Sequence, residues 1–162
     1  MREVGAEGLE LCRLQARVFE ASANYMPGSS AIFIRRFMYS SVATRWDRGM
    51  VSFENRTVGA ILTDVYAEYG RPAAGSSKMG PEQLHWIGYL YRYWAYRYEM
   101  PSCKIYKLVS GNELNGLFYS YHTFDVEQAI ERIAESRGIV LGMNDIARGV
   151  EALRKIRISA SH

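Results

Sequence analysis

Cysteine is scarce in this chain of 162 residues, which contains only Cys12 and Cys103 and has no CxxC spacing. A structural zinc site needs about four Cys or His ligands close together. The cysteines, even taken with His85 and His122, are too widely spaced along the chain to suggest such a set. We therefore expect no metal site and no cofactor. The same cysteine usage favours a reducing compartment, the cytoplasm.

Long apolar runs are also missing. No stretch approaches the roughly 18 apolar residues that a membrane-spanning helix needs, so we expect no such helix and no membrane partner. The first ten residues are acidic, contain glycine and lack the apolar core of a secretory signal. Both absences favour a cytoplasmic protein.

No recognised catalytic motif is present, because the chain lacks GxSxG, HExxH and a phosphate-cradling glycine loop. This favours a non-enzymatic role and assigns no catalytic residue. An enzyme would need an unrecognised site near His122 or His85, in a pocket lined by polar groups and tyrosines. The simpler expectation is that His122, at a helix junction, donates to a backbone carbonyl, and that His85 packs against its neighbours.

Lysine is rare, since sixteen of the twenty basic residues are arginine. Arginine suits bidentate contacts with carboxylates and phosphates, and it stacks on aromatic rings. The formal net charge of +3 is only mildly basic, and a phosphate-binding surface needs clustered charge rather than a high total. With 13% aromatic and 23% charged residues, the composition excludes intrinsic disorder over most of the length.

Helical spacing of apolar residues dominates what the chain does contain, and no alternating strand pattern exceeds four residues. We predict an all-α fold, a single domain over 1–162 with six to eight helices and at most one small β-hairpin. A flexible loop is expected at about 70–80, and an isolated strand or helical turn at 50–53. The expected helices cover about 7–25, 31–46, 58–69 after a Thr57 cap, 81–99, 102–109, 111–121 after a Ser110–Glu113 capping box, 126–137 after an Asp125 cap, and a last helix that begins at Asn144 or Asp145.

The distinctive segment is 84–98, LHWIGYLYRYWAYRY, which has two aromatic stripes at helical spacing. A helix that is apolar nearly all round is usually buried, so we expect it to be the central helix. Gly88 inside it predicts a close approach of another backbone or an aromatic ring. The alternative is that the stripe of Trp86, Tyr89, Tyr93 and Tyr96 stays partly exposed as an interface, because Tyr and Arg are enriched at interface hot spots.

Candidate partner-binding residues follow from these patterns. On the second expected helix, neighbouring Arg35 and Arg36 point about 100° apart, so at most one should face inward. The full candidate set is Arg35, Arg36, Arg92, Tyr93, Tyr96, Arg97 and His122. An alternative is a nucleic-acid-binding regulator that pairs rings with cations, using Arg92, Arg97, Lys104 and Lys107.

Four segments carry a family resemblance: SSAIFIRRFMYS (29–40), LHWIGYLYRYWAYRYE (84–99), KIYKLV (104–109) and YHTFDVEQAIERI (121–133). Together they resemble a group of small, uncharacterised bacterial proteins associated with toxin–antitoxin-like gene neighbourhoods and mobile elements. The resemblance covers about 29–136 and transfers no catalytic residue. It implies a cytoplasmic bacterial protein that acts as an antitoxin-type or regulatory partner of another protein.

The leading hypothesis is therefore a non-enzymatic interaction module that binds and neutralises a partner protein, a toxin encoded nearby. Nucleic-acid binding is the first alternative, and an enzyme with a site near His122 or His85 is the second. A second copy of the chain is kept as a further candidate partner.

Overall fold

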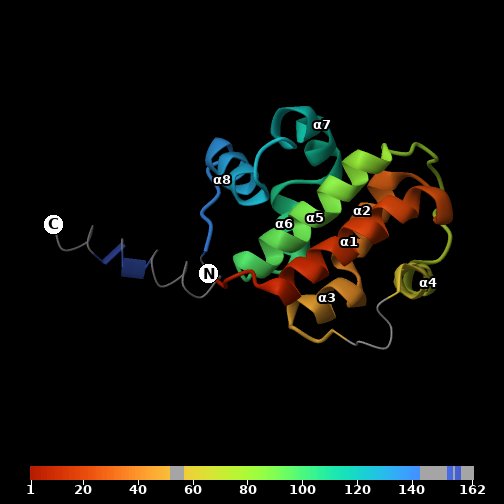
Figure 1. The fold of residues 1–162 in the computed structure, drawn as a ribbon, viewed down its shortest axis with the longest axis horizontal. Helices are drawn as coiled ribbons and strands as arrows, with labels where there is room; N and C mark the ends of the chain where they lie inside the picture. Colours follow the sequence, from red (N-terminus) through yellow and green to blue (C-terminus); the bar gives the residue numbers. More distant parts are fainter. Residues whose placement is uncertain (52–56, 143–152, 155, 158–162) are drawn as a thin grey trace.

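The computed structural model describes residues 1–51, 57–142, 153–154 and 156–157. Within them the chain forms eight helices and no strand, which confirms the all-α prediction (Figure 1). The helices are α1 (Ala6–Tyr25), α2 (Ser30–Tyr39), α3 (Ser41–Asp47), α4 (Val58–Tyr69), α5 (Pro81–Arg97), α6 (Ser102–Leu108), α7 (Gly111–Tyr121) and α8 (Val126–Ser136).

Helices α1 and α5 lie side by side and antiparallel at the centre (Figure 1). A Cβ on Gly88 of α5 would lie 2.8 Å from the carbonyl oxygen of Gln15 and 2.9 Å from the Phe19 ring. The Gly88 carbonyl accepts a 3.0 Å hydrogen bond from the side-chain amide of Gln15. Both expectations are confirmed: the aromatic helix is central, and Gly88 marks its closest approach to another backbone.

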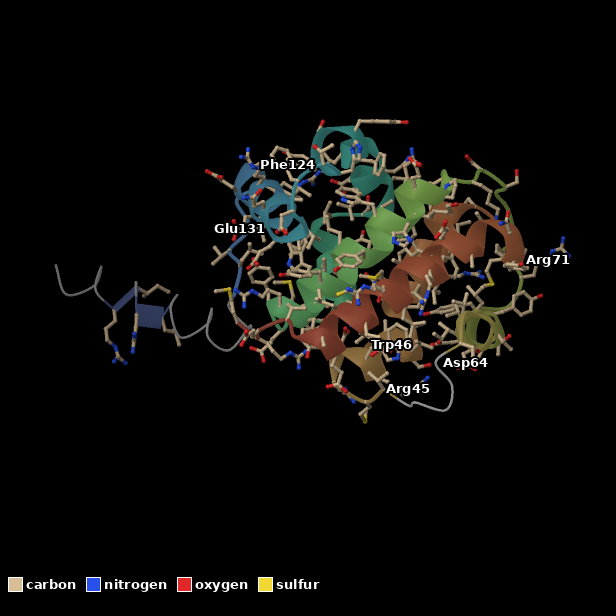
Figure 2. The ribbon with its side chains drawn as sticks, in the orientation of Figure 1. Arg45, Trp46, Asp64, Arg71, Phe124 and Glu131 are labelled. Atoms are coloured by element: carbon tan, nitrogen blue, oxygen red, sulfur yellow. The ribbon has the colours of Figure 1, made fainter. Side chains whose placement is uncertain are left out.

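One continuous apolar core draws side chains from all eight helices. Helix α5 contributes buried Leu84, Leu90 and Trp94, among others, and α3 contributes Trp46. Figure 2 shows Trp46 beside exposed Arg45, its neighbour on α3. No helix in the described part of the chain has the length and hydropathy that a membrane span requires.

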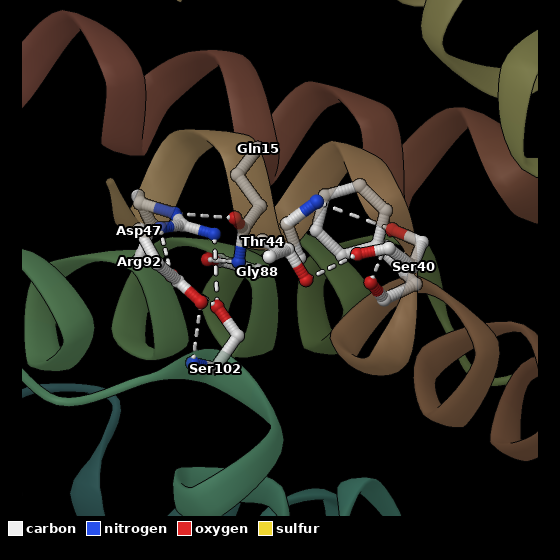
Figure 3. Close-up of polar contacts among 9 residues, drawn as sticks. Gln15, Ser40, Thr44, Asp47, Gly88, Arg92 and Ser102 are labelled. Atoms are coloured by element: carbon white, nitrogen blue, oxygen red, sulfur yellow. Dashed lines mark hydrogen bonds and ion pairs between the residues drawn. The ribbon is translucent and has the colours of Figure 1, made fainter. Parts of the chain in front are cut away.

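The single helix predicted over 31–46 is wrong, because the chain breaks at Ser40 into α2 and α3. Ser40 has extended backbone angles. Its hydroxyl donates to the Phe37 carbonyl at 2.6 Å and accepts from the Ala43 amide at 3.2 Å (Figure 3). The serine therefore ends one helix and caps the next.

Side-chain caps also begin three helices where the sequence predicted them. Thr57 caps α4, and Ser110 with Glu113 forms the predicted capping box of α7. Asp125 caps α8 through the amide of Glu127. Residues 70–80 form no helix, as expected. The predictions for 52–53 and for the start of the last helix at Asn144 or Asp145 lie outside the described residues.

Candidate partner-binding groove

Arg92 is buried in the centre of the molecule, with 1% of its surface exposed. Its guanidinium donates to Gln15 at 2.7 Å, to Asp47 at 2.8 Å and to the Ser102 hydroxyl at 3.0 Å (Figure 3). Asp47 in turn accepts from the Ser102 amide at 2.8 Å. A buried charge is costly unless it is paired and hydrogen-bonded. These contacts satisfy the Arg92 charge and link four helices, α1, α3, α5 and α6. The prediction that Arg92 lies on a partner-binding surface is corrected accordingly.

Tyr93 and Arg97 face α8 rather than open solvent. The Tyr93 hydroxyl donates to Glu127 at 3.2 Å, and the Arg97 Nε donates to the same carboxylate at 2.9 Å. Burial and the adjacent Glu127 carboxylate raise the pKa of Tyr93 to about 12. The hydrogen bond to Glu127 raises the pKa of Arg97. Both side chains therefore serve to hold α8 against α5.

Tyr96 is covered by the N-terminal segment. The Arg2 guanidinium lies 3.7 Å from the centre of the Tyr96 ring, and the Arg2 amide donates to the Arg97 carbonyl at 2.8 Å. Trp86, Tyr89, Tyr93 and Tyr96 are all half-buried. The second aromatic stripe thus has partial exposure, but part of it is already occupied by this chain's own residues.

Arg35 is exposed, whereas Arg36 turns toward the protein. Arg36 donates to the Gly70 carbonyl at 2.7 Å and lies 5.5 Å from the centre of the Tyr69 ring. This confirms that at most one of the two faces inward. Of the four cations assigned to nucleic-acid binding, Arg92 is buried and Arg97 is paired with Glu127, so these two present no free charge to phosphates.

His122 and His85, far apart in sequence, line one hollow of 490 Å³ between α1, α5, α7 and the start of α8. We call it the aromatic hollow. Its lining residues are Glu20, Glu82, His85, Trp86, Tyr89, Phe118, His122, Phe124 and Val126. Six of these carry aromatic or imidazole rings on α5, α7 or the α7–α8 junction, and two are carboxylates on α1 and α5.

Both histidines are oriented by hydrogen bonds. His122 Nδ1 lies 2.8 Å from the Phe118 carbonyl, as expected for a junction histidine, and its ring stacks on Phe118 with centroids 4.3 Å apart. His85 Nδ1 lies 3.1 Å from the Glu20 carboxylate. Because a carbonyl and a carboxylate only accept, each Nδ1 carries a proton. In the neutral ring this leaves each Nε2 as an acceptor.

Three rings of the aromatic hollow, those of Trp86, Phe118 and His122, contact one another in series. Trp86 meets Phe118 edge to face at 5.7 Å between centroids. Phe124, at the α7–α8 junction (Figure 2), is 36% exposed and has the Arg132 guanidinium 4.6 Å from its ring centre. A guanidinium–ring contact is therefore already made on one edge of this surface.

Two further hollows continue along α1. One of 440 Å³ shares Glu20 with the aromatic hollow. It shares Tyr25 and Val58 with another of 570 Å³, which is lined mainly by apolar residues of α4 and the end of α1, including Tyr66. Tyr25 is 77% exposed. We call the three together the α1 groove.

Of the predicted site residues only His122 lines the aromatic hollow. Arg35 and Arg36 lie on α2, and the four on α5 are engaged elsewhere. Sequence reasoning missed Glu20, Phe118 and Phe124. The aromatic run Tyr121 to Phe124 beside a helix junction was an available signal, but which helix it faces depends on tertiary packing.

Comparison of the chain with protein-family models, with curated proteins and with solved structures finds no match.

Proposed function

We propose that the chain is a protein-interaction module that binds a partner through the α1 groove, with the aromatic hollow as its main contact. The observation that carries this proposal is the gathering of partly exposed Trp86, Tyr89 and Phe124 around one open hollow. Tryptophan and tyrosine dominate interface hot spots because they supply large contact area at low entropic cost.

The resemblance of the sequence to proteins of toxin–antitoxin-like neighbourhoods supplies the first partner to test. An antitoxin-type protein binds a toxin and neutralises it, and such binding needs a surface rather than catalytic groups. The α1 groove supports this role because it is formed by five helices, α1, α4, α5, α7 and the start of α8, and is lined by both apolar and polar side chains.

The experiment is co-expression of the chain with each adjacent gene product, followed by size-exclusion chromatography with light scattering. We expect one neighbour to co-elute at a fixed ratio and to be toxic when expressed alone. Tyr89→Ala with Phe124→Ala should weaken the complex at least about tenfold, the cost of losing about 1.4 kcal/mol at hot-spot positions. Tyr39→Ala is the control, because Tyr39 is an exposed tyrosine of α2 outside the groove.

Circular dichroism of each variant separates loss of binding from loss of fold. If no neighbour co-elutes, or if Tyr39→Ala weakens the complex as much as the groove variant, the groove is not the partner site.

General acid–base catalysis is a second candidate function, favoured by the Glu20–His85 pair. A carboxylate that orients a histidine Nδ1 leaves Nε2 able to take a proton, and His85 lines the aromatic hollow. The aromatic hollow also holds polar groups and one tyrosine, Tyr89, whereas the sequence-based expectation is of several tyrosines. Purified protein and His85→Ala should be compared on chromogenic ester, phosphate and peptide substrates. Turnover that disappears in the variant would favour catalysis over partner binding.

A further inference from the structure

The chemistry of the aromatic hollow is more specific than a general contact surface. Its rings have electron-rich faces, and its two carboxylates, Glu20 and Glu82, lie on neighbouring helices α1 and α5. None of the described lining residues is lysine or arginine. In a chain with net charge +3, this hollow thus combines π faces with negative charge.

Such a combination favours a cation. A guanidinium or ammonium group over an aromatic face is stabilised by about 0.5–1 kcal/mol at exposed sites and by more when it is desolvated. Carboxylates beside the ring add charge-assisted hydrogen bonds. The Arg132–Phe124 contact at 4.6 Å shows the same chemistry within this chain.

The same charges disfavour nucleic acid. Bases would stack on Trp86 and Tyr89, but the phosphate backbone would then approach Glu20 and Glu82. Like charges at close range oppose association, and Arg132 is the one cation that contacts a lining ring among the contacts described.

We infer that the aromatic hollow binds an arginine or lysine side chain from a basic segment of the partner protein, with the cation between the rings and the carboxylates of Glu20 and Glu82. This rests on the proposed function, because it names the chemistry of the partner. The charge complementarity of the hollow selects the occupant.

Tryptophan fluorescence provides a local probe for this site. The chain has three tryptophans; Trp46 and Trp94 are buried, and Trp86 is half-buried in the aromatic hollow. Quenching by acrylamide therefore reports mainly on Trp86. The probe ligand is a capped pentapeptide, Gly-Gly-Arg-Gly-Gly, and the matched neutral peptide carries citrulline in place of arginine.

We expect the arginine peptide to protect Trp86 from quenching, with an affinity roughly fivefold or more above that of the citrulline peptide. Glu20→Gln combined with Glu82→Gln should reduce that affinity by about fivefold, because it removes two exposed charge interactions. Asp64→Asn is the control, because Asp64 is an exposed carboxylate of α4 far from Phe124 (Figure 2). It should change the affinity less than twofold.

Equal protection by the two peptides, no protection by either, or stronger protection by a short oligothymidylate would each overturn the inference. The peptide assay needs no partner protein, so it separates two failures. If a partner co-elutes and binds the double glutamine variant as tightly as the wild type, the proposed function holds but the inferred cation site is wrong. If the hollow selects the arginine peptide but no partner co-elutes, the cation site holds but the proposed function is wrong.

Discussion

At the residue scale, Gly88 shows how a single missing Cβ sets the distance between α1 and α5. A glycine inside a helix costs about 1 kcal/mol relative to alanine. Here the close packing on Gln15 and Phe19, and the hydrogen bond from the Gln15 amide, offset that cost. The identity of residue 88 is therefore decided by the neighbouring helix and not by local helix propensity.

Replacing Gly88 with alanine should lower the free energy of unfolding by about 1–3 kcal/mol, because the new methyl group overlaps the α1 backbone. The matched control is Gly116→Ala in α7, where a Cβ meets nothing within 4 Å. That variant should gain about 0.5–1 kcal/mol from helix propensity. Urea unfolding at constant m-value measures both. The same sign of change at both positions would contradict the packing explanation.

Several residue-scale features were predictable because they depend on near neighbours. The His122 contact with a backbone carbonyl and the different directions of Arg35 and Arg36 follow from local geometry. The glycine at position 88 of the expected helix indicated a close approach, but its partner Gln15 lies 73 residues away and could not be named from the sequence. Arg92 was not predictable in this way. Its partners Gln15 and Asp47 are 77 and 45 residues away in sequence, so helical periodicity cannot reveal them.

At the scale of the elements, the Arg92 network joins α1, α3, α5 and α6 through one guanidinium. Removing one partner of a buried ion pair leaves the other charge without compensation, which costs about 3–5 kcal/mol. Without Arg92, the Asp47 carboxylate would be the uncompensated charge, although it keeps its hydrogen bonds to Ser102.

Arg92→Met should therefore lower the free energy of unfolding by about 3–5 kcal/mol. Arg35→Met removes an equally long cationic side chain from an exposed position and should change stability by no more than about 0.5 kcal/mol. Chemical denaturation of both variants provides the measurement. Comparable losses would show that Arg92 contributes through general charge and not through its buried contacts.

Helix boundaries were predictable where a capping side chain coincides with a change in apolar spacing. At Ser40 the two signals disagree, because the apolar positions Phe37, Met38 and Val42 continue across the break. Periodicity alone therefore merges α2 with α3, whereas the serine hydroxyl separates them.

At the scale of the whole molecule, several buried acids must stay neutral in the folded state. Burial raises the pKa of the Cys12 thiol to about 12, and burial with nearby carboxylates raises the pKa of Tyr98 to about 12. Burial also raises the pKa of Tyr91 well above its usual value, and its hydroxyl donates to the Val109 carbonyl at 2.6 Å. The unfolded chain loses these protons at lower pH than the folded chain does.

Stability should therefore be fully present below about pH 9 and fall steadily as the pH rises toward 12. In that window the folded state binds more protons than the unfolded state, so the free energy of unfolding decreases with pH. Urea unfolding at a series of alkaline pH values tests this. Unchanged stability between about pH 9 and 11 would contradict it.

The all-α architecture was predictable from the sequence, but the aromatic hollow was not. The spacing of apolar residues identifies the buried face of each helix. The local sequence does not show which other helix packs against that face. Glu20, Trp86 and Phe118 come from three helices, and only their packing makes them one surface. The candidate residues concentrated on α5 because its aromatic run was the strongest single signal.

The antiparallel pairing of α1 with α5 also has a consequence for the order of events during synthesis. The last residue of α1 is Tyr25 and the last of α5 is Arg97, so the apolar side of α1 emerges long before its cover. At translation rates of about 5–20 residues per second, the delay is roughly 4–15 s. During that interval the part of α1 that α5 covers stays exposed on the nascent chain, and a chaperone that binds such segments would find its target near the ribosome exit.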